Sequence, residues 1–371
     1  MIRSVAYFGT YDAEYPRSAV PMRGLCELGL QVYEMRVPFS PPPAAQMTTA
    51  VGAARTAAAL ARAYCRLLVA LRRRVAVDAI VVGYPGHFVV PLGQLAALGG
   101  AKLVFDPLVS LHDTFVGDRS LISGASVSAR MVGAVDRLAC LLPDLVLADT
   151  RAHAEYYRDT IGVPESRLAV VPVGALPVAG ASGAARTLVA DKPLRVLQYG
   201  KWSPLHGTET VLAAAELLRD APIHFVLVGE GQLSVALRRT IADCRLTNVE
   251  WLGSLTAERL RSEVLRADVC LGIFGRSQKA ARVVPNKVYD ALACGRPLVT
   301  ANTEGAREFL SDGVDSVLVP AADAPALASA LRGLLSCERR DALGRGALEL
   351  YRRSLTPHAV AERMLEAMNA L

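Results

Sequence analysis

The chain has 371 residues, of which 52% are apolar and 20% charged, and its formal net charge is +6. This length accommodates two domains of ordinary size, and the apolar share predicts packed cores instead of disorder. Aromatic residues make up only 6% and no basic stripe is interleaved with them, which argues against a nucleic-acid-binding protein. The positive charge fits a soluble protein, or one with an anionic partner such as a sugar nucleotide, a lipid phosphate or an acidic membrane surface.

No apolar run reaches the roughly 18–20 residues that cross a bilayer, and the first residues enter a strand-like run without a signal-peptide pattern. The seven cysteines are scattered singly without a C-x-x-C pair, and the six histidines lack the spacing of metal ligands. These patterns predict a cytoplasmic protein with reduced thiols and no metal.

In the first half, short apolar runs alternate with helical patterns. The predicted strands are 4–8, 30–36, 79–83, 102–106, 145–148 and 168–171, and the predicted helices include 17–28, 50–74, 128–142 and 151–160. Apolar strands alternating with helices indicate a parallel sheet covered on both faces. The N-terminal domain is therefore predicted over 1–180.

A Gly-, Ala- and Ser-rich stretch over 174–192 indicates an interdomain linker, placed at 181–193. The pattern then restarts, with predicted strands 194–199, 223–228, 249–252, 269–273, 298–300 and 316–319, and predicted helices 208–219, 234–244, 257–265, 287–293, 324–335 and 341–352. A C-terminal domain is predicted over 194–355, and a last helix within 356–371 is expected to pack back toward the first domain. The predicted fold class is α/β, with two Rossmann-like doubly wound domains facing a cleft; ligands bind at strand carboxyl ends in such sheets.

Two basic segments of the second half predict a diphosphate site. In QYGKWSPLHG (198–207), Lys201 follows a strand and precedes a helix start, where a cation and free backbone N–H groups suit phosphates. In the second segment, Lys279, Arg282 and Lys287 are expected on a loop just before a helix that begins near Asn286. Asp290 follows one turn later, where a carboxylate suits ribose hydroxyls. The alternative for both segments is a solvated charged surface.

The motifs LVGEGQ (227–232), NVEWLGSL (248–255), ADVCLGIF (267–274) and PNKVYDALACGRPLVT (285–300), with the Gly-Lys…His-Gly loop, resemble the retaining glycosyltransferases of family 4, which have the GT-B fold. The resemblance covers roughly 194–335 and is looser in the N-terminal half, which in this family usually binds the acceptor. It implies transfer of a hexose or N-acetylhexosamine from a UDP- or GDP-sugar with retention of configuration. The nucleotide sugar is a co-substrate, and no cofactor is expected.

Residue by residue, the resemblance implies roles around the donor. Lys201 stands where the family usually has an arginine on the diphosphate, and His206 where a lysine commonly follows. Arg282 and Asp290 occupy the two ends of the E-x7-E motif, so that a cation replaces the first acid and Asp290 keeps the second, on the ribose. A subgroup with a P-N-K signature before the second acid shows similar departures.

The backbone of 285–287 would cradle the phosphates, and the loops 229–231 and 252–254 would flank the nucleobase. The predicted donor-binding residues are Gly9, Gly200, Lys201, His206, Glu230, Gly253, Ser254, Lys279, Arg282, Pro285, Asn286, Lys287 and Asp290. The predicted catalytic residues are Lys201, Arg282, His112, His87 and Asp106; the last three follow strands of the first half, where acceptor contacts belong. No D-x-D pair occurs, so cations and a helix dipole are expected to neutralise the leaving group without a metal.

The predicted helical stretch 50–74 contains six arginines, namely Arg55, Arg62, Arg66, Arg72, Arg73 and Arg74. They predict either an exposed helix face or peripheral contact with an anionic membrane, which would suit a lipid-linked acceptor. Two rival functions stay open: a nucleotide-sugar epimerase of the same fold, and a catalytically silent binding homologue.

Overall fold

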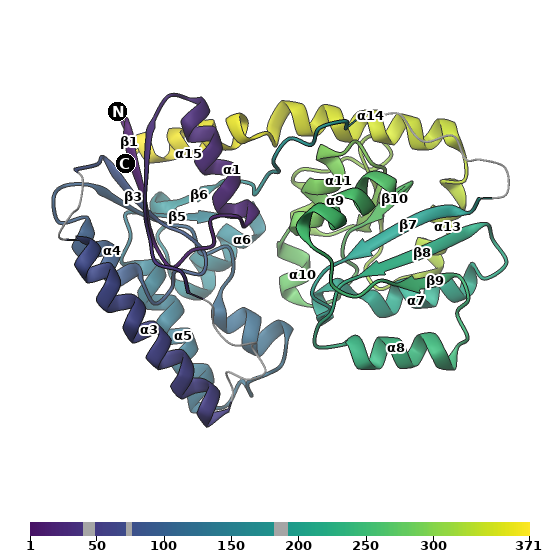
Figure 1. Cartoon of the computed structure of the whole chain (residues 1–371), viewed down its shortest axis with the longest axis horizontal. Coiled ribbons are helices and arrows are strands. Elements are labelled where there is room, and N and C mark those ends of the chain that lie inside the picture. Colours follow the sequence, from purple (N-terminus) through teal and green to yellow (C-terminus); the bar gives the residue numbers. More distant parts are fainter. Residues whose placement is uncertain (40–48, 72–75, 182–191) are drawn as a thin grey trace. The chain divides into compact units, whose positions relative to one another are not determined.

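The computed structural model describes residues 1–39, 49–71, 76–181 and 192–371, which form two compact units (Figure 1). Unit 1 contains Met1–Gly174 and Thr356–Leu371, and unit 2 contains Ala175–Leu355. Each unit is built on a six-stranded parallel sheet with helices, which confirms the predicted α/β fold class.

The sheet of unit 1 has the strand order β2-β1-β3-β4-β5-β6. Val5 of β1 pairs with Val32 of β2 on one side and with Ala79 of β3 on the other. The strands are β1 (Ser4–Gly9), β2 (Gln31–Arg36), β3 (Ala79–Val82), β4 (Lys102–Phe105), β5 (Leu145–Ala148) and β6 (Leu168–Val170). The helices are α1 (Pro16–Glu27), α3 (Ala50–Leu71), α4 (Val90–Ala96), α5 (Val127–Leu141), α6 (Arg151–Tyr156) and α15 (Pro357–Asn369), with shorter turns η1 (Asp113–Asp118), η2 (Tyr157–Ile161) and η3 (Glu165–Arg167).

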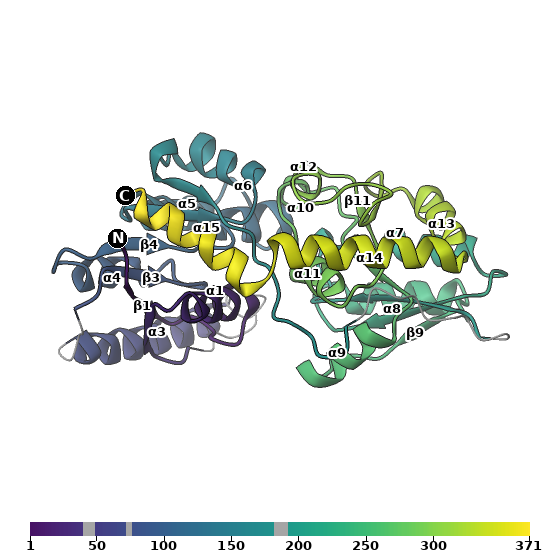
Figure 2. The same ribbon diagram turned by 90° about the horizontal axis from the view of Figure 1, so that it is seen from above.

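The last helix, α15, belongs to unit 1 and lies along α1 in both ribbon views (Figures 1 and 2). Gly24 of α1 permits this close packing, because a Cβ at that position would collide with the carbonyl of Pro357. Val360 and Met364 of α15 are fully buried. The first and last segments of the chain therefore share one core.

The sheet of unit 2 has the strand order β12-β11-β10-β7-β8-β9. Its strands are β7 (Leu194–Tyr199), β8 (Ile223–Val228), β9 (Val249–Trp251), β10 (Val269–Leu271), β11 (Leu298–Ala301) and β12 (Val317–Val319). Its helices are η4 (Pro204–His206), α7 (Thr208–Leu217), α8 (Ser234–Asp243), α9 (Ala257–Arg266), α10 (Gln278–Arg282), α11 (Asn286–Ala293), α12 (Glu304–Arg307), α13 (Ala324–Gly333) and α14 (Cys337–Ser354). Because β7 lies between β10 and β8, the loops that follow these strands meet at one edge of the sheet.

The predicted strands agree with the observed ones to within two residues at most ends. One segment was predicted wrongly: Lys279 and Arg282 lie in the short helix α10, not on a loop, and Ser277 caps this helix by accepting a hydrogen bond from the N–H of Ala280. The short helices α4 and α12 were not predicted.

The chain passes from unit 1 to unit 2 at Gly174, before the predicted linker. Ala175 already packs in unit 2, where its N–H donates to the carbonyl of Leu355 and its carbonyl accepts from the hydroxyl of Tyr351. Most of the predicted linker, and Arg72–Arg74 of the predicted arginine face, lie outside the described residues. Within the described ranges, no helix has the length and apolar character needed to cross a membrane.

Candidate functional site

Three glycine loops meet at the carboxyl ends of β7, β8 and β9. The N–H of Gly229 donates to the carbonyl of Gly253 over 2.6 Å. A Cβ on Gly229 would collide with the carbonyl of Gly200, and a Cβ on Gly231 would collide with the backbone of Trp202. Gly229 also has φ +131°, which side chains rarely adopt. These loops pack backbone against backbone, and this edge is where parallel sheets bind ligands.

Two nitrogen groups converge on the Cα of Gly200 from different elements. A Cβ at Gly200 would lie 3.2 Å from the Nζ of Lys287, on α11, and closer still to the Nε2 of His206, on η4. The missing side chain thus leaves a small space that both groups face. Sequence reasoning placed these three residues at one site, and the structure brings them together.

Lys287 is buried, with 4% of its surface exposed, and its Nζ has no hydrogen-bond partner among the described residues. The Nζ lies over the aromatic ring of Tyr199, 5.7 Å from its centroid, where the electron-rich ring face attracts a cation. Burial lowers the pKa of Lys287 from 10.5 to about 7. An ammonium group held in this way is available to an anion, because no carboxylate within the described ranges is bonded to it.

His206 presents an N–H group to the same space. Its Nδ1 lies 3.1 Å from the Ser203 hydroxyl and 3.4 Å from the Ser203 backbone N–H. Because a backbone N–H can only donate, Nδ1 is assigned as the acceptor and Nε2 as the protonated nitrogen. The carbonyl of His206 accepts from the N–H of Phe274, which ties η4 to the loop after β10.

The N-terminus of α11 adds a partial positive charge beside Lys287. Pro285 is the residue at the helix start, and no side chain of residues 1–39, 49–71, 76–181 or 192–371 caps this end. An uncapped helix N-terminus directs backbone N–H groups outward and favours an anion. The cations of α10 also belong to this region of the chain: Lys279 is buried and Arg282 half-buried, with its carbonyl packed against Gly305.

Asp290 lies one turn into α11, and its Oδ2 accepts a hydrogen bond from the hydroxyl of Tyr199. Burial raises the pKa of Asp290, and the hydrogen bond from Tyr199 opposes that rise. Burial also raises the pKa of Tyr199 well above its ordinary value, so that its hydroxyl is a donor at neutral pH. The predicted contact of Asp290 with ribose stays a prediction. Sequence reasoning missed Tyr199, because a tyrosine that ends a strand resembles a core residue.

Glu230, predicted beside the nucleobase, belongs to a surface cluster. Its Oε1 accepts from Arg238 over 2.5 Å and from the indole N–H of Trp251 over 3.2 Å. The guanidinium of Arg238 also lies 4.5 Å from the ring centroid of Trp251. Hydrogen bonds from Ser234 and Arg238 lower the pKa of Glu230. Neither Arg238 nor Trp251 was predicted as a site residue, although Trp251 lies in the NVEWLGSL motif and Arg238 follows Glu230 by eight residues.

The other predicted donor residues lie at different depths. Lys201 and Ser254 are exposed, and Gly253 approaches Glu230, with its Cβ position 3.7 Å from the Oε1. In unit 1, Gly9 has φ +124°, and its Cβ position lies 3.0 Å from Val89. Contact of these residues with a donor stays a prediction.

Two of the three predicted acceptor residues are internal groups of unit 1. Both carboxylate oxygens of Asp106 accept from the Nε of Arg17, over 2.7 and 2.9 Å, and the pair is buried. His87 is buried with its ring edge toward Phe105, and burial lowers its pKa. Its Nε2 lies 3.5 Å from the Oδ1 of Asp136, without the geometry of a hydrogen bond. A direct acceptor contact by either residue stays a prediction that this burial does not favour.

His112, the third predicted acceptor residue, is half-buried at the start of η1. Its backbone N–H donates to the Oδ2 of Asp136 over 2.8 Å, and the same oxygen accepts from the Ser110 hydroxyl over 2.6 Å. The N–H of Leu111 donates to the other oxygen. Asp136 therefore fixes the loop that carries His112.

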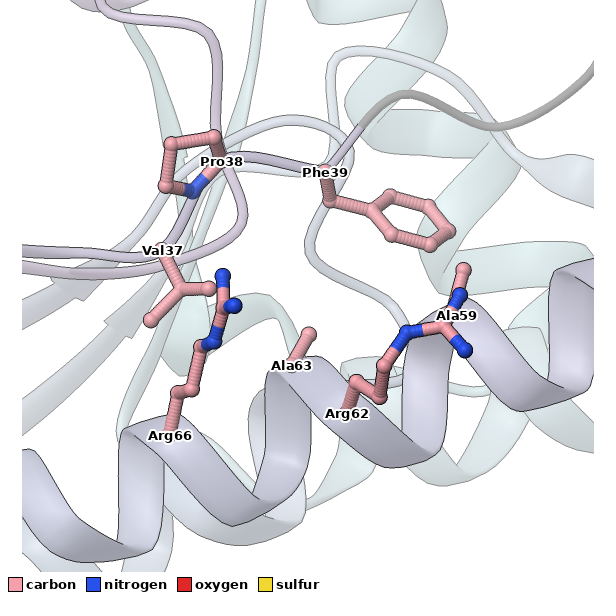
Figure 3. Close-up of a pocket in the computed structure, with 7 residues that line it drawn as sticks. All are labelled: Val37, Pro38, Phe39, Ala59, Arg62, Ala63 and Arg66. Atoms are coloured by element: carbon pink, nitrogen blue, oxygen red, sulfur yellow. The ribbon is translucent and has the colours of Figure 1, made fainter.

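A groove of about 160 Å³ lies between α3 and the segment that follows β2 (Figure 3). Arg62 and Arg66 reach up from α3 toward Phe39 and Pro38. The stretch 35–77 contains seven arginines and no acidic residue. In the described parts of the chain, no group of three or more His, Cys, Asp or Glu side chains is arranged to hold a metal ion.

Residues 193–337, which include the whole cluster around Lys287, match the family described as Glycosyl transferases group 1. Among curated relatives, the D-inositol 3-phosphate glycosyltransferase of Geodermatophilus obscurus is 28% identical over 62% of this chain and 52% of its own length. The GDP-mannose-dependent alpha-(1-6)-phosphatidylinositol monomannoside mannosyltransferase of Mycolicibacterium smegmatis is 28% identical over 68% of this chain and 65% of its own length. The chain spans about half the length of the first of these relatives.

Solved structures show the same fold. Alr3699/HepE of Anabaena, in complex with UDP and glucose, is 14% identical with a TM-score of 0.67, and the match covers 100% of both chains. Sucrose-phosphate synthase of Thermosynechococcus elongatus is 17% identical with a TM-score of 0.69, and the match covers 98% of both chains. These similarities confirm the predicted GT-B fold.

Proposed function

We propose that this chain, whose residues 193–337 match the group 1 glycosyl transferases, transfers a hexose or N-acetylhexosamine from a UDP- or GDP-sugar to an acceptor hydroxyl. The observation that carries the proposal is the buried ammonium of Lys287, which has no hydrogen-bond partner among the residues described and lies beside a helix start that none of their side chains caps. The UDP complex of the Anabaena protein and the GDP-mannose dependence of the mycobacterial relative support a nucleotide-sugar donor.

In the proposed reaction, the bond between the sugar C1 and the donor phosphate oxygen breaks, and a bond from C1 to the acceptor oxygen forms. Negative charge develops on the departing nucleoside diphosphate. Lys287, the Nε2–H of His206 and the N–H groups at the start of α11 are positioned to stabilise it. Lys201, in the loop after β7, and Arg282, at the end of α10, add further positive charge. Removing one preorganised donor of this kind lowers rates by about a hundredfold or more.

We further propose that transfer proceeds with retention and without a metal. The acceptor then attacks the face from which the diphosphate departs, and its proton passes to the leaving phosphate oxygen. Cations and a helix N-terminus take the place of a divalent ion in neutralising the leaving group. Full activity in a strong chelator, with the α-anomer kept from donor to product, is the expected result. Loss of activity in chelator with rescue by Mn²⁺ contradicts the metal-independent reaction.

The donor is identified by a thermal-shift panel of nucleoside diphosphates, followed by mass spectrometry of products formed from the best sugar donor. Lys287→Met should abolish the shift, and Lys192→Met, which changes an exposed lysine just before β7, should leave it intact. A wild-type protein that binds neither UDP nor GDP and forms no glycosylated product contradicts the proposal. The comparisons favour neither the epimerase nor the catalytically silent homologue.

Peripheral contact with an anionic membrane is a separate proposal, which would suit a lipid-linked acceptor. It is supported by the acid-free stretch 35–77 and by Arg62 and Arg66 in the groove of α3. The double variant Arg62→Glu and Arg66→Glu should lose co-sedimentation with vesicles that contain phosphatidylglycerol, and a charge reversal at Arg158, on the exposed surface of η2, should not. Equal co-sedimentation of both variants with the wild type excludes this contact.

A further inference from the structure

Lysine is rare in this protein, and it is concentrated near the candidate site. Of the 41 basic residues only five are lysines, and three of these are Lys201, Lys279 and Lys287. Lys287 differs from the exposed Lys201 in that its Nζ is buried and has no hydrogen-bond partner in the part of the chain that the structure describes. A buried ammonium group is costly, so the surroundings must explain how it is kept in place without a counter-ion.

Tyr199 contacts both polar groups on one face of α11. It is the last residue of β7, next to Gly200. Its ring centroid lies 5.7 Å from the Nζ of Lys287, and its hydroxyl donates to the Oδ2 of Asp290. Residues three apart on a helix lie on the same side, which is why one aromatic ring reaches both.

That spacing would also allow Lys287 and Asp290 to pair with each other, and in the described structure they do not. The Tyr199 hydroxyl donates a hydrogen bond to the carboxylate of Asp290. The face of the same ring attracts the ammonium of Lys287 without carrying a formal charge. A carboxylate paired with the lysine would compete with an incoming phosphate, whereas an aromatic ring does not.

We infer that Tyr199 is the positioning residue of this anion site: its hydroxyl keeps Asp290 away from Lys287, and its ring keeps the ammonium aimed at the space over Gly200. The inference rests on the proposed function, since the anion is the diphosphate of the donor. It assigns a role to a residue that does not itself touch the reacting atoms.

Several titratable groups surround the lysine. His206 faces it from η4, Tyr199 from β7 and Asp290 from its own helix, while Arg261 of α9 acts on Asp290. Burial is the cause of the low pKa of Lys287. At pH 7 about half of the lysine is therefore charged in the free protein, and an anion bound over Gly200 should draw a proton onto it.

The small number of lysines makes a direct test practical. Lysine labelled with ¹³C at Cε gives five resonances, and Lys287→Met identifies the one that titrates near neutral pH. Tyr199→Phe keeps the ring and removes the hydroxyl. The freed carboxylate should then raise the pKa of Lys287 by roughly one unit or more, because nearby opposite charges produce shifts of that size. It should also weaken UDP or GDP binding.

The ring is tested by comparing Tyr199→Phe with Tyr199→pentafluorophenylalanine, which has nearly the same shape but a face that no longer attracts cations. The fluorinated variant should show a lower Lys287 pKa than Tyr199→Phe. This pair preserves packing, so the result does not depend on whether a smaller residue such as leucine folds. Unfolding temperatures confirm that the variants are compared in the folded state.

The inference is overturned when neither the hydroxyl nor the ring substitution moves the Lys287 titration. It is also overturned when Tyr199→Phe leaves both the titration and nucleotide affinity unchanged. Failure of the proposed function gives a different result: the Lys287 resonance would still respond to both substitutions, but the wild type would bind neither UDP nor GDP.

Discussion

Nucleotide-sugar binding is expected to weaken as pH rises above neutrality, because only the protonated form of Lys287 attracts the diphosphate. With a pKa of about 7 in the free protein, about three-quarters of the lysine is charged at pH 6.5 and about 3% at pH 8.5. If the bound form keeps its proton throughout this range, affinity should fall by about 25-fold, or roughly 1.9 kcal/mol at 1.4 kcal/mol per decade. The phosphates of a nucleotide sugar do not change protonation in this pH range, unlike the terminal phosphate of UDP or GDP. The nucleotide sugar is therefore the ligand to use in this measurement.

Isothermal titration calorimetry at five pH values, in buffers of different ionisation enthalpy, measures both the affinity and the protons taken up. Lys287→Arg is the matched control, because a guanidinium stays charged and should give a flat profile. Lys287→Met should bind weakly at every pH. A wild-type affinity that is constant from pH 6.5 to 8.5, or a Lys287→Arg profile as steep as that of the wild type, refutes the reasoning.

Three further predictions concern stability and packing. Lys287→Met should raise the free energy of unfolding at pH 7 by roughly 4 kcal/mol, since one pKa unit is about 1.4 kcal/mol and burial lowers the pKa of this lysine from 10.5 to about 7. The unfolded chain binds more protons than the folded one between pH 7 and 10.5, so wild-type stability should rise with pH there; urea unfolding of both proteins at pH 7 and 9 checks both points. Gly200→Ala should abolish nucleotide binding in calorimetry, because its Cβ would collide with the imidazole of His206 and crowd the Nζ of Lys287. Gly99→Ala is the control: no described atom lies within 4 Å of its Cβ position, so this variant should bind like the wild type. Asp106→Asn should lower the free energy of unfolding of unit 1 in urea by about 3–5 kcal/mol, because it leaves the buried Arg17 without its counter-charge. Glu27→Gln, which breaks the exposed pair with Arg23, should lower it by less than about 1 kcal/mol. Equal losses in the two variants would contradict this.

The sheets could be predicted from the sequence because most of their strands are short apolar runs, β2 being the polar exception at the edge of its sheet. The six residues of β8, for instance, are almost all buried. The helix α10 escaped prediction because five residues are too few to show a helical period. Its position beside α12 depends on contacts with Gly305, which sequence order does not reveal.

At the candidate site, the sequence identified the segments but not how deeply their side chains are buried. Lys201 and Lys287 were both predicted as cations for a diphosphate, yet the first is exposed and the second buried. The burial of Lys287 depends on how α11 packs against β10, β11 and α14, which the sequence does not show. Asp106 was predicted to contact a ligand but is paired inside unit 1. A polar residue after a strand indicates a ligand contact, but its partner Arg17 lies 89 residues away, so the sequence could not show that the carboxylate is already paired.

The choice of lysine at position 287 follows from its ability to lose a proton. This chain uses arginine at 36 of its 41 basic positions, so a lysine in the buried cationic position stands out. A buried guanidinium without a carboxylate would stay charged in the empty site and carry the full desolvation cost, whereas lysine becomes neutral as its pKa falls to about 7. Lys287→Arg should therefore unfold at lower urea concentration than the wild type at pH 8.5, and saturating nucleotide sugar should narrow the difference. If the two proteins were equally stable without ligand, proton loss would not be the reason for lysine here, and the explanation would have to come from side-chain shape alone.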